Sequence, residues 1–149
     1  MKDAPDTPAE LKARALRALA RREHSRAELE RKLAPHTRHP EALRALLVHL
    51  EEKKQLSNER FAEQRARVLA RKYGAARIRH DLKAKGLAED VIDRAMPADE
   101  AERARAVMAR KYRNPPTSRE ERARRARFLQ GRGFSAEVIH RLVLRDGEE

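Results

Sequence analysis

Apolar residues recur along most of this chain at helical spacing. After Pro40 they stand at positions i, i+3, i+4 and i+7, the pattern of an amphipathic helix with one apolar face: Leu43, Leu46, Leu47 and Leu50. No stretch alternates apolar and polar residues as a half-buried strand does. The pattern therefore predicts an all-α protein.

Capping residues, prolines and glycines divide this pattern into separate helices. Capping boxes, in which a Ser or Thr stands three residues before a Glu, begin at Thr7, Ser25 and Ser118. Glycines at 74, 86, 131 and 133 and the pair Pro115-Pro116 indicate ends and turns. The predicted helices span residues 8–22, 26–34, 40–53, 58–73, 75–85, 88–96, 98–112, 119–130 and 136–144.

These helices resemble three copies of a three-helix unit. Residues 19–22, 69–72 and 108–111 end the first helix of each unit with similar sequences, and residues 86–94 match residues 133–141. Stacked helical units of this kind make an extended body in which most contacts join neighbours. We therefore predict a tandem array of three three-helix repeats forming an elongated, curved body. Its units are 1–56, with a short N-terminal tail, 57–96 and 97–149.

Composition narrows the possible functions. Three Phe, two Tyr and no Trp are too few to anchor one large core, so several small cores are expected. The absence of Cys excludes a disulfide framework and thiolate chemistry. His36 and His39 could ligate a metal, but the nearest acid is Glu41, and no glycine-rich loop or nucleophile–base pair stands out. We expect no enzyme activity, no metal and no cofactor.

The N-terminus and the apolar pattern also bear on location. The first eleven residues are polar and contain no apolar signal region, and no apolar run approaches the roughly 18 residues of a membrane span. We expect a cytoplasmic protein without membrane contact, acting as a monomer.

The chain is strongly basic throughout. It has 36 Lys plus Arg against 24 Asp plus Glu, a formal net charge of +12. The three units carry 13 and 9, 10 and 6, and 13 and 9 basic and acidic residues, so each is +4. An elongated basic body suits an elongated acidic ligand, such as nucleic acid or an acidic protein assembly.

Two stretches concentrate the positive charge. Residues 60–85 contain nine Lys or Arg and only Glu63 and Asp81 as acids, and residues 119–132 form a second cluster. The alternative interpretation is a solvated helix surface. Aromatic residues are expected in cores or at helix ends, so any nucleic-acid contact should be mainly to phosphates. The candidate binding residues are Arg21, Arg22, Arg26, Arg65, Arg71, Lys72, Arg77, Arg79, Lys83, Lys85, Arg110, Lys111, Arg122, Arg125 and Arg132.

Several of these segments together resemble the RecX family, the regulators of the RecA recombinase. The resemblance rests on residues 20–33, 60–63, 77–78, 85–86, 91–92, 127–135 and 138–139, in this order. The sequence departs from the family pattern at Pro35-His36, Asn58-Glu59 and Ala75-Ala76, which stand at expected turns.

The resemblance implies a three-unit helical fold and binding in the deep groove of the RecA filament. It implies inhibition of RecA's ATP hydrolysis, strand exchange and coprotease functions in recombination, DNA repair and the bacterial SOS response. It also implies DNA contact, which the charge pattern predicts to be weak and non-specific on single- or double-stranded DNA. The alternative is a non-specific DNA-binding helical protein that acts without RecA.

Overall fold

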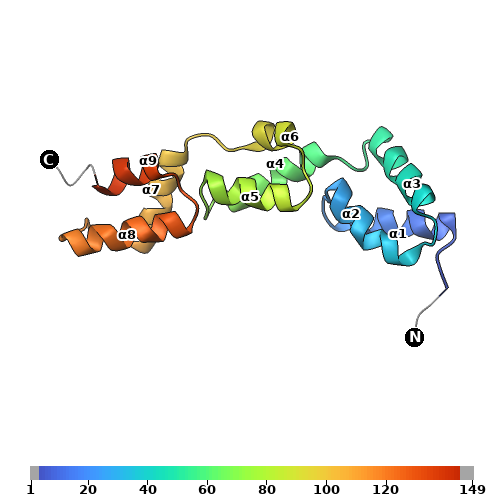
Figure 1. Ribbon diagram of the computed structural model, residues 1–149, viewed down its shortest axis with the longest axis horizontal. Coiled ribbons are helices and arrows are strands. Elements are labelled where there is room, and N and C mark those ends of the chain that lie inside the picture. Colours follow the sequence, from blue (N-terminus) through green and yellow to red (C-terminus); the bar gives the residue numbers. More distant parts are fainter. Residues whose placement is uncertain (1–3, 145–149) are drawn as a thin grey trace.

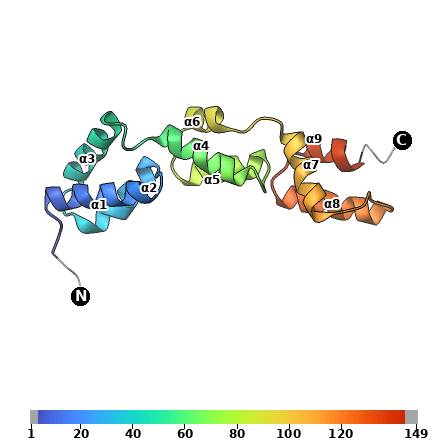
Figure 2. The ribbon, with the colours of Figure 1, turned by 180° about the vertical axis from the view of Figure 1, so that it is seen from behind.

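The computed structural model describes residues 4–144, which are helical and contain no strand. Three groups of helices lie in a row, with α1 at one end and α8 and α9 at the other (Figure 1, and from behind in Figure 2). This arrangement confirms the predicted all-α tandem array. The first unit holds α1 (Pro8–Arg21), α2 (Arg26–Leu33), the 3-10 turn η1 (Ala34–His36) and α3 (Pro40–Glu52). The second holds α4 (Asn58–Leu69), α5 (Ala75–Ala84) and α6 (Glu89–Ala95), and the third holds α7 (Glu100–Lys111), α8 (Arg119–Gly131), α9 (Ala136–Ile139) and the π-helical η2 (His140–Leu144).

Several helices begin with the side-chain caps that the sequence predicts. Thr7 accepts a hydrogen bond from the backbone of Glu10, whose carboxylate accepts one from the backbone of Thr7, and this closes a complete capping box. Ser25 begins α2 in the same way. The third predicted box is only half formed. Ser118 caps α8, but the Glu121 carboxylate accepts its hydrogen bond from the backbone N–H of Thr117 at 2.9 Å.

Two helix boundaries near the contact between units two and three differ from the predicted ones by two or more residues. α4 ends at Leu69, because residues 70–73 form a turn in which the Lys72 and Tyr73 amides both donate to the Leu69 carbonyl. α7 begins at Glu100 rather than residue 98, because Asp99 has a left-handed backbone with φ of 58° that cannot continue a helix backwards. Both differences lie where units two and three approach each other.

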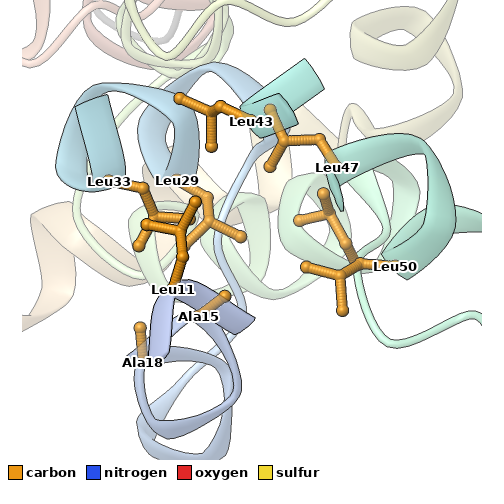
Figure 3. Packing of buried hydrophobic residues seen from close by; sticks show 9 residues of the cluster. Leu11, Ala15, Ala18, Leu29, Leu33, Leu43, Leu47 and Leu50 are labelled. Atoms are coloured by element: carbon orange, nitrogen blue, oxygen red, sulfur yellow. The ribbon is translucent and has the colours of Figure 1, made fainter. Parts of the chain in front are cut away.

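Each unit has its own small apolar core, as the scarcity of aromatic residues predicted. In the first unit, leucines from α1, α2 and α3 converge on one cluster (Figure 3). The second core contains Phe61, Ile78, Leu82, Leu87 and Ile92. The third contains Ala104, Val107, Leu129, Phe134, Val138, Ile139 and Val143. The repeat is visible in these cores: Leu87 and Phe134 each follow a glycine with positive φ and are each buried.

The first joint, where unit one contacts unit two, contains polar hydrogen bonds as well as ion pairs. The Ser25 hydroxyl donates to the Lys85 carbonyl at 2.8 Å, and the Asn58 side chain accepts from the Arg26 amide at 2.8 Å. Gly86, with φ of 83°, lies so close to Ala27 that an added Cβ would come within 2.6 Å of the Ala27 Cβ. The two units are therefore in contact at Gly86, where a side chain would not fit without a shift.

Candidate anion-binding surface

The second joint, between units two and three, is built from backbone hydrogen bonds around two glycines. The amides of Gly74 and Ala76 donate to the carbonyls of Arg132 and Gly133 at 2.8 and 3.1 Å. The Glu100 carboxylate accepts from the Ala75 amide at 2.8 Å. The turn that ends α8, together with Glu100 of α7, therefore satisfies the free N–H groups at the start of α5.

Neither glycine of the second joint has room for a side chain. A Cβ on Gly74 would lie 2.4 Å from the Phe134 Cα, and a Cβ on Gly133 would lie 2.4 Å from the Arg77 Cβ. Gly133 also has φ of 88°, which L side chains rarely adopt. This packing brings the end of α4, the start of α5 and the ends of α7 and α8 together.

About half of the basic side chains in residues 60–85 are ion-paired. Four of their acidic partners lie outside the stretch and were not included in the local charge count, so that count overstated the unbalanced charge. The pairs are Arg60 with Glu23, Arg65 with Asp81, Arg79 with Glu89 and Asp93, Lys83 with Glu89, and Lys85 with Glu28.

The candidate residues of unit one are mostly paired as well. Arg22 lies 3.0 Å from Glu28, and Arg26 lies 2.7 Å from Glu51. Burial alone would raise the pKa of Glu28, but the hydrogen bonds and charge of Arg22 outweigh it and lower that pKa. Arg21 is exposed and, among the described residues, has no acidic partner. These pairs indicate that much of the positive charge near the first joint stabilises the fold.

Six candidate residues that have no acidic partner in the described part of the chain lie at the second joint. Within residues 4–144, none of the following lies within 4.0 Å of a carboxylate: Arg71, Lys72, Arg77, Arg110, Lys111 and Arg132. All six belong to the candidate set, and they come from both units. The Arg110 guanidinium also donates to the Arg71 carbonyl, which ties the end of α7 to the turn after α4.

Four of these cations surround a cleft of about 300 Å³. Its lining consists of Lys72 from unit two and of Val107, Arg110, Lys111, Phe128 and Arg132 from unit three. None of these lining residues is acidic. Phe128 and Val107 form the apolar part of the cleft wall, and the charged groups of the other lining residues surround this apolar part. We call this feature the cationic cleft.

Aromatic rings position the cations of the cleft without neutralising them. The Phe128 ring centroid lies 4.8 Å from the Lys111 Nζ and 5.1 Å from the Arg132 Cζ. The Tyr73 ring lies 4.4 Å from the Arg77 Cζ and 5.6 Å from the Arg132 Cζ. Cation–π contacts of this kind contribute about 0.5–1 kcal/mol each at exposed sites and leave the positive charge free to bind an anion.

The sequence did not reveal this role for aromatic residues. Phe61 and Phe134 are buried in cores as predicted, each about 4% exposed. Phe128 and Tyr73 are instead half-buried, and cationic side chains lie against their rings. One local signal was available: Phe128 and Arg132 stand four residues apart at the end of α8 and therefore share a helix face.

The remaining candidates of unit three lie outside the cleft. The Arg125 guanidinium lies 4.3 Å from the Tyr112 ring centroid and 4.0 Å from the Glu121 carboxylate, and its side chain is only 11% exposed. Arg122 is half-buried and does not line the cleft. In residues 4–144, no three His, Asp or Glu side chains are grouped as metal ligands. Over that same range, no helix combines the length and apolarity needed to cross a bilayer.

Sequence comparisons place the second and third units in a described family. The profile described as "RecX, second three-helix domain" matches residues 57–96, and that described as "RecX, third three-helix domain" matches residues 98–143. "Regulatory protein RecX" of Ralstonia nicotianae is 45% identical, over 97% of this chain and 97% of its own. The protein of the same name from Herbaspirillum seropedicae is 46% identical, over 91% of this chain and 90% of its own.

Solved structures share the fold. The crystal structure of RecX from Lactobacillus salivarius superposes with a TM-score of 0.77, covering 95% of this chain and 96% of that one, at 18% sequence identity. A second crystal structure, of a regulatory protein RecX, gives a TM-score of 0.73 at 24% identity and covers 92% of this chain and 74% of that one. The tandem arrangement of three-helix units is therefore common to proteins whose sequences have diverged widely.

Proposed function

The chain belongs to the RecX family of regulatory proteins, and we propose that it binds the RecA nucleoprotein filament and inhibits RecA's ATP hydrolysis, strand exchange and coprotease activities. Family membership implies a regulator of RecA. We further propose that it acts in the cytoplasm as a monomer, in recombination, DNA repair and the SOS response, and without catalysing a reaction itself.

The observation that carries this proposal is the unbalanced positive surface at the second joint. A nucleoprotein filament is long and presents nucleic-acid phosphates, so a row of helical units that concentrates unpaired cations around one cleft can lie along it. The proposed contact residues are Arg71, Lys72, Arg77, Arg110, Lys111 and Arg132. We propose a secondary, stabilising role for the ion-paired candidates, which are Arg22, Arg26, Arg65, Arg79, Lys83, Lys85 and Arg125.

RecA-catalysed ATP hydrolysis on single-stranded DNA tests the proposal. Adding this protein to preassembled filaments is expected to lower the hydrolysis rate in a concentration-dependent way, with the inhibition weakening as salt is raised. Binding to the same DNA without RecA is measured in parallel. If the protein coats the free DNA but leaves hydrolysis on the filament unchanged, it is a DNA-binding protein that acts without RecA, and the proposal is wrong.

A further inference from the structure

We propose that the cationic cleft is a phosphate-binding site that bridges units two and three, and that a phosphate group bound there stiffens the second joint. All residues of the site belong to this chain, and no other protein contributes to it. The proposal goes beyond the proposed function, because neither the binding nor the stiffening requires RecA.

The first argument is electrostatic. The chain has 24 acidic residues, and many of its basic side chains elsewhere are paired with them. The cleft instead brings Lys72, Arg110, Lys111 and Arg132 around one space with no carboxylate in its lining. Like charges held together repel and lower stability, and a bound anion removes that cost. The cleft is therefore built for an external anion.

The second argument concerns the shape of the anion. The donors approach from three elements: Lys72 follows α4, Arg110 and Lys111 end α7, and Arg132 follows α8. A phosphate group carries oxygens directed to several sides and can accept from all three, whereas a carboxylate offers two oxygens in one plane. The volume of about 300 Å³ is at the lower end for ligand pockets, and so suits one or two phosphate groups.

The third argument is that the cleft is preorganised. The Phe128 ring holds Lys111 and Arg132 on its faces or edges at 4.8 and 5.1 Å, so these long side chains lose less freedom when a ligand binds. Arg110 is held by its hydrogen bond to the Arg71 carbonyl. Three of the four cations are thus positioned before any anion arrives.

The position of the cleft determines what binding does. Lys72 belongs to unit two and the other cations belong to unit three, and the Gly74–Arg132 backbone hydrogen bond lies between them. An anion that contacts both sides adds a bridge parallel to the backbone hydrogen bonds of the joint. Because it binds the folded chain and not the unfolded one, it also raises stability.

Thermal unfolding with inorganic pyrophosphate, at ionic strength held constant with sodium chloride, tests the binding. The natural chain is expected to gain about 3–6 °C in Tm at saturation. The pair Lys72→Gln and Lys111→Gln, which removes two cleft charges but keeps much of the side-chain length, should lose most of that gain. The matched pair Lys12→Gln and Arg44→Gln, exposed in unit one, should keep it. Equal gains in both pairs would show that only net charge matters and would overturn the site.

Three further probes identify the source and chemistry of the anion. Oligothymidylate and an abasic phosphodiester of the same length should stabilise the natural chain alike, because the cleft binds phosphate rather than base. Pyrophosphate alone giving the shift, with neither oligomer doing so, would restrict the site to free phosphates. Polyglutamate of equal charge should give a clearly smaller shift, and an equal one would contradict phosphate recognition.

Amide hydrogen exchange tests the stiffening of the joint. The Gly74 and Ala76 amides donate across the second joint, so their exchange should slow when pyrophosphate binds. The Arg26 amide, which donates to Asn58 across the first joint, serves as the control and should not change. Equal slowing at both joints would indicate a general effect of the anion and contradict a local bridge. Because RecA is absent throughout, failure here is separate from failure of the proposed function.

Discussion

Reversing three charges of the cationic cleft is expected to raise the concentration of protein that halves RecA's ATP hydrolysis by about tenfold or more. The variant carries Lys72→Glu, Arg110→Glu and Lys111→Glu. Each change replaces an attraction for the filament's phosphates by a repulsion, and a tenfold loss corresponds to about 1.4 kcal/mol of binding free energy. The measurement is a titration of the variant into RecA filaments on single-stranded DNA at fixed salt.

The control has the same net charge and leaves the cleft intact. It carries Lys12→Glu, Arg44→Glu and Lys53→Glu, all exposed in unit one. Three reversals lower the formal charge by six in either variant, from +12 to +6. Circular dichroism and thermal melting confirm that both fold before they are compared. If the two variants lose inhibition equally, net charge alone drives binding, and the assignment of the contact to the cleft is wrong.

Gly133→Ala is expected to lower the free energy of unfolding by about 2–4 kcal/mol. The new Cβ would lie 2.4 Å from the Arg77 Cβ and 2.7 Å from the Arg77 amide nitrogen, and φ of 88° is strained for alanine. Relief requires the turn to separate from α5, which breaks the hydrogen bonds of the second joint. Urea unfolding followed by circular dichroism measures the loss.

A glycine two residues away provides the matched control. Gly131 ends α8, and a Cβ placed there meets nothing within 4 Å. Gly131→Ala should therefore be neutral or stabilise by up to about 1 kcal/mol, as expected when alanine replaces glycine in a helix. A loss of stability as large for Gly131→Ala as for Gly133→Ala would mean that close packing at the second joint is not what requires glycine.

The fold could be predicted well because its signals are local. Caps such as Thr7 and Ser25 begin helices through hydrogen bonds that span three residues, and the apolar faces follow from helical spacing. The repeat was visible because equivalent glycines need the same backbone: Gly86 and Gly133 have φ of 83° and 88°. The local rules did not predict the C-terminal end of α4 or the start of α7, because contacts with the neighbouring unit determine where these helices end and begin.

The site could be predicted only in part because it depends on distant residues. Local counting identified Arg71, Lys72 and Arg77 but could not separate them from Lys85, whose partner Glu28 belongs to unit one. The cleft itself is assembled from α7 and α8, which pack together in unit three, and from Lys72, which the second joint adds. The charge pattern of the sequence also gave no indication that Phe128 would form part of the wall of the cleft.

Site-specific photo-crosslinking tests most directly whether this surface meets the filament. The chain has no Cys, so a single cysteine can carry the reagent. Ala106 is exposed on α7 one turn before Arg110, and Ala45 is equally classed as exposed on α3 in unit one. On preassembled RecA filaments, Ala106→Cys is expected to crosslink to RecA or its DNA, and Ala45→Cys to give no more than background. Crosslinking from Ala45→Cys that equals or exceeds that from Ala106→Cys would contradict the proposed contact at the second joint.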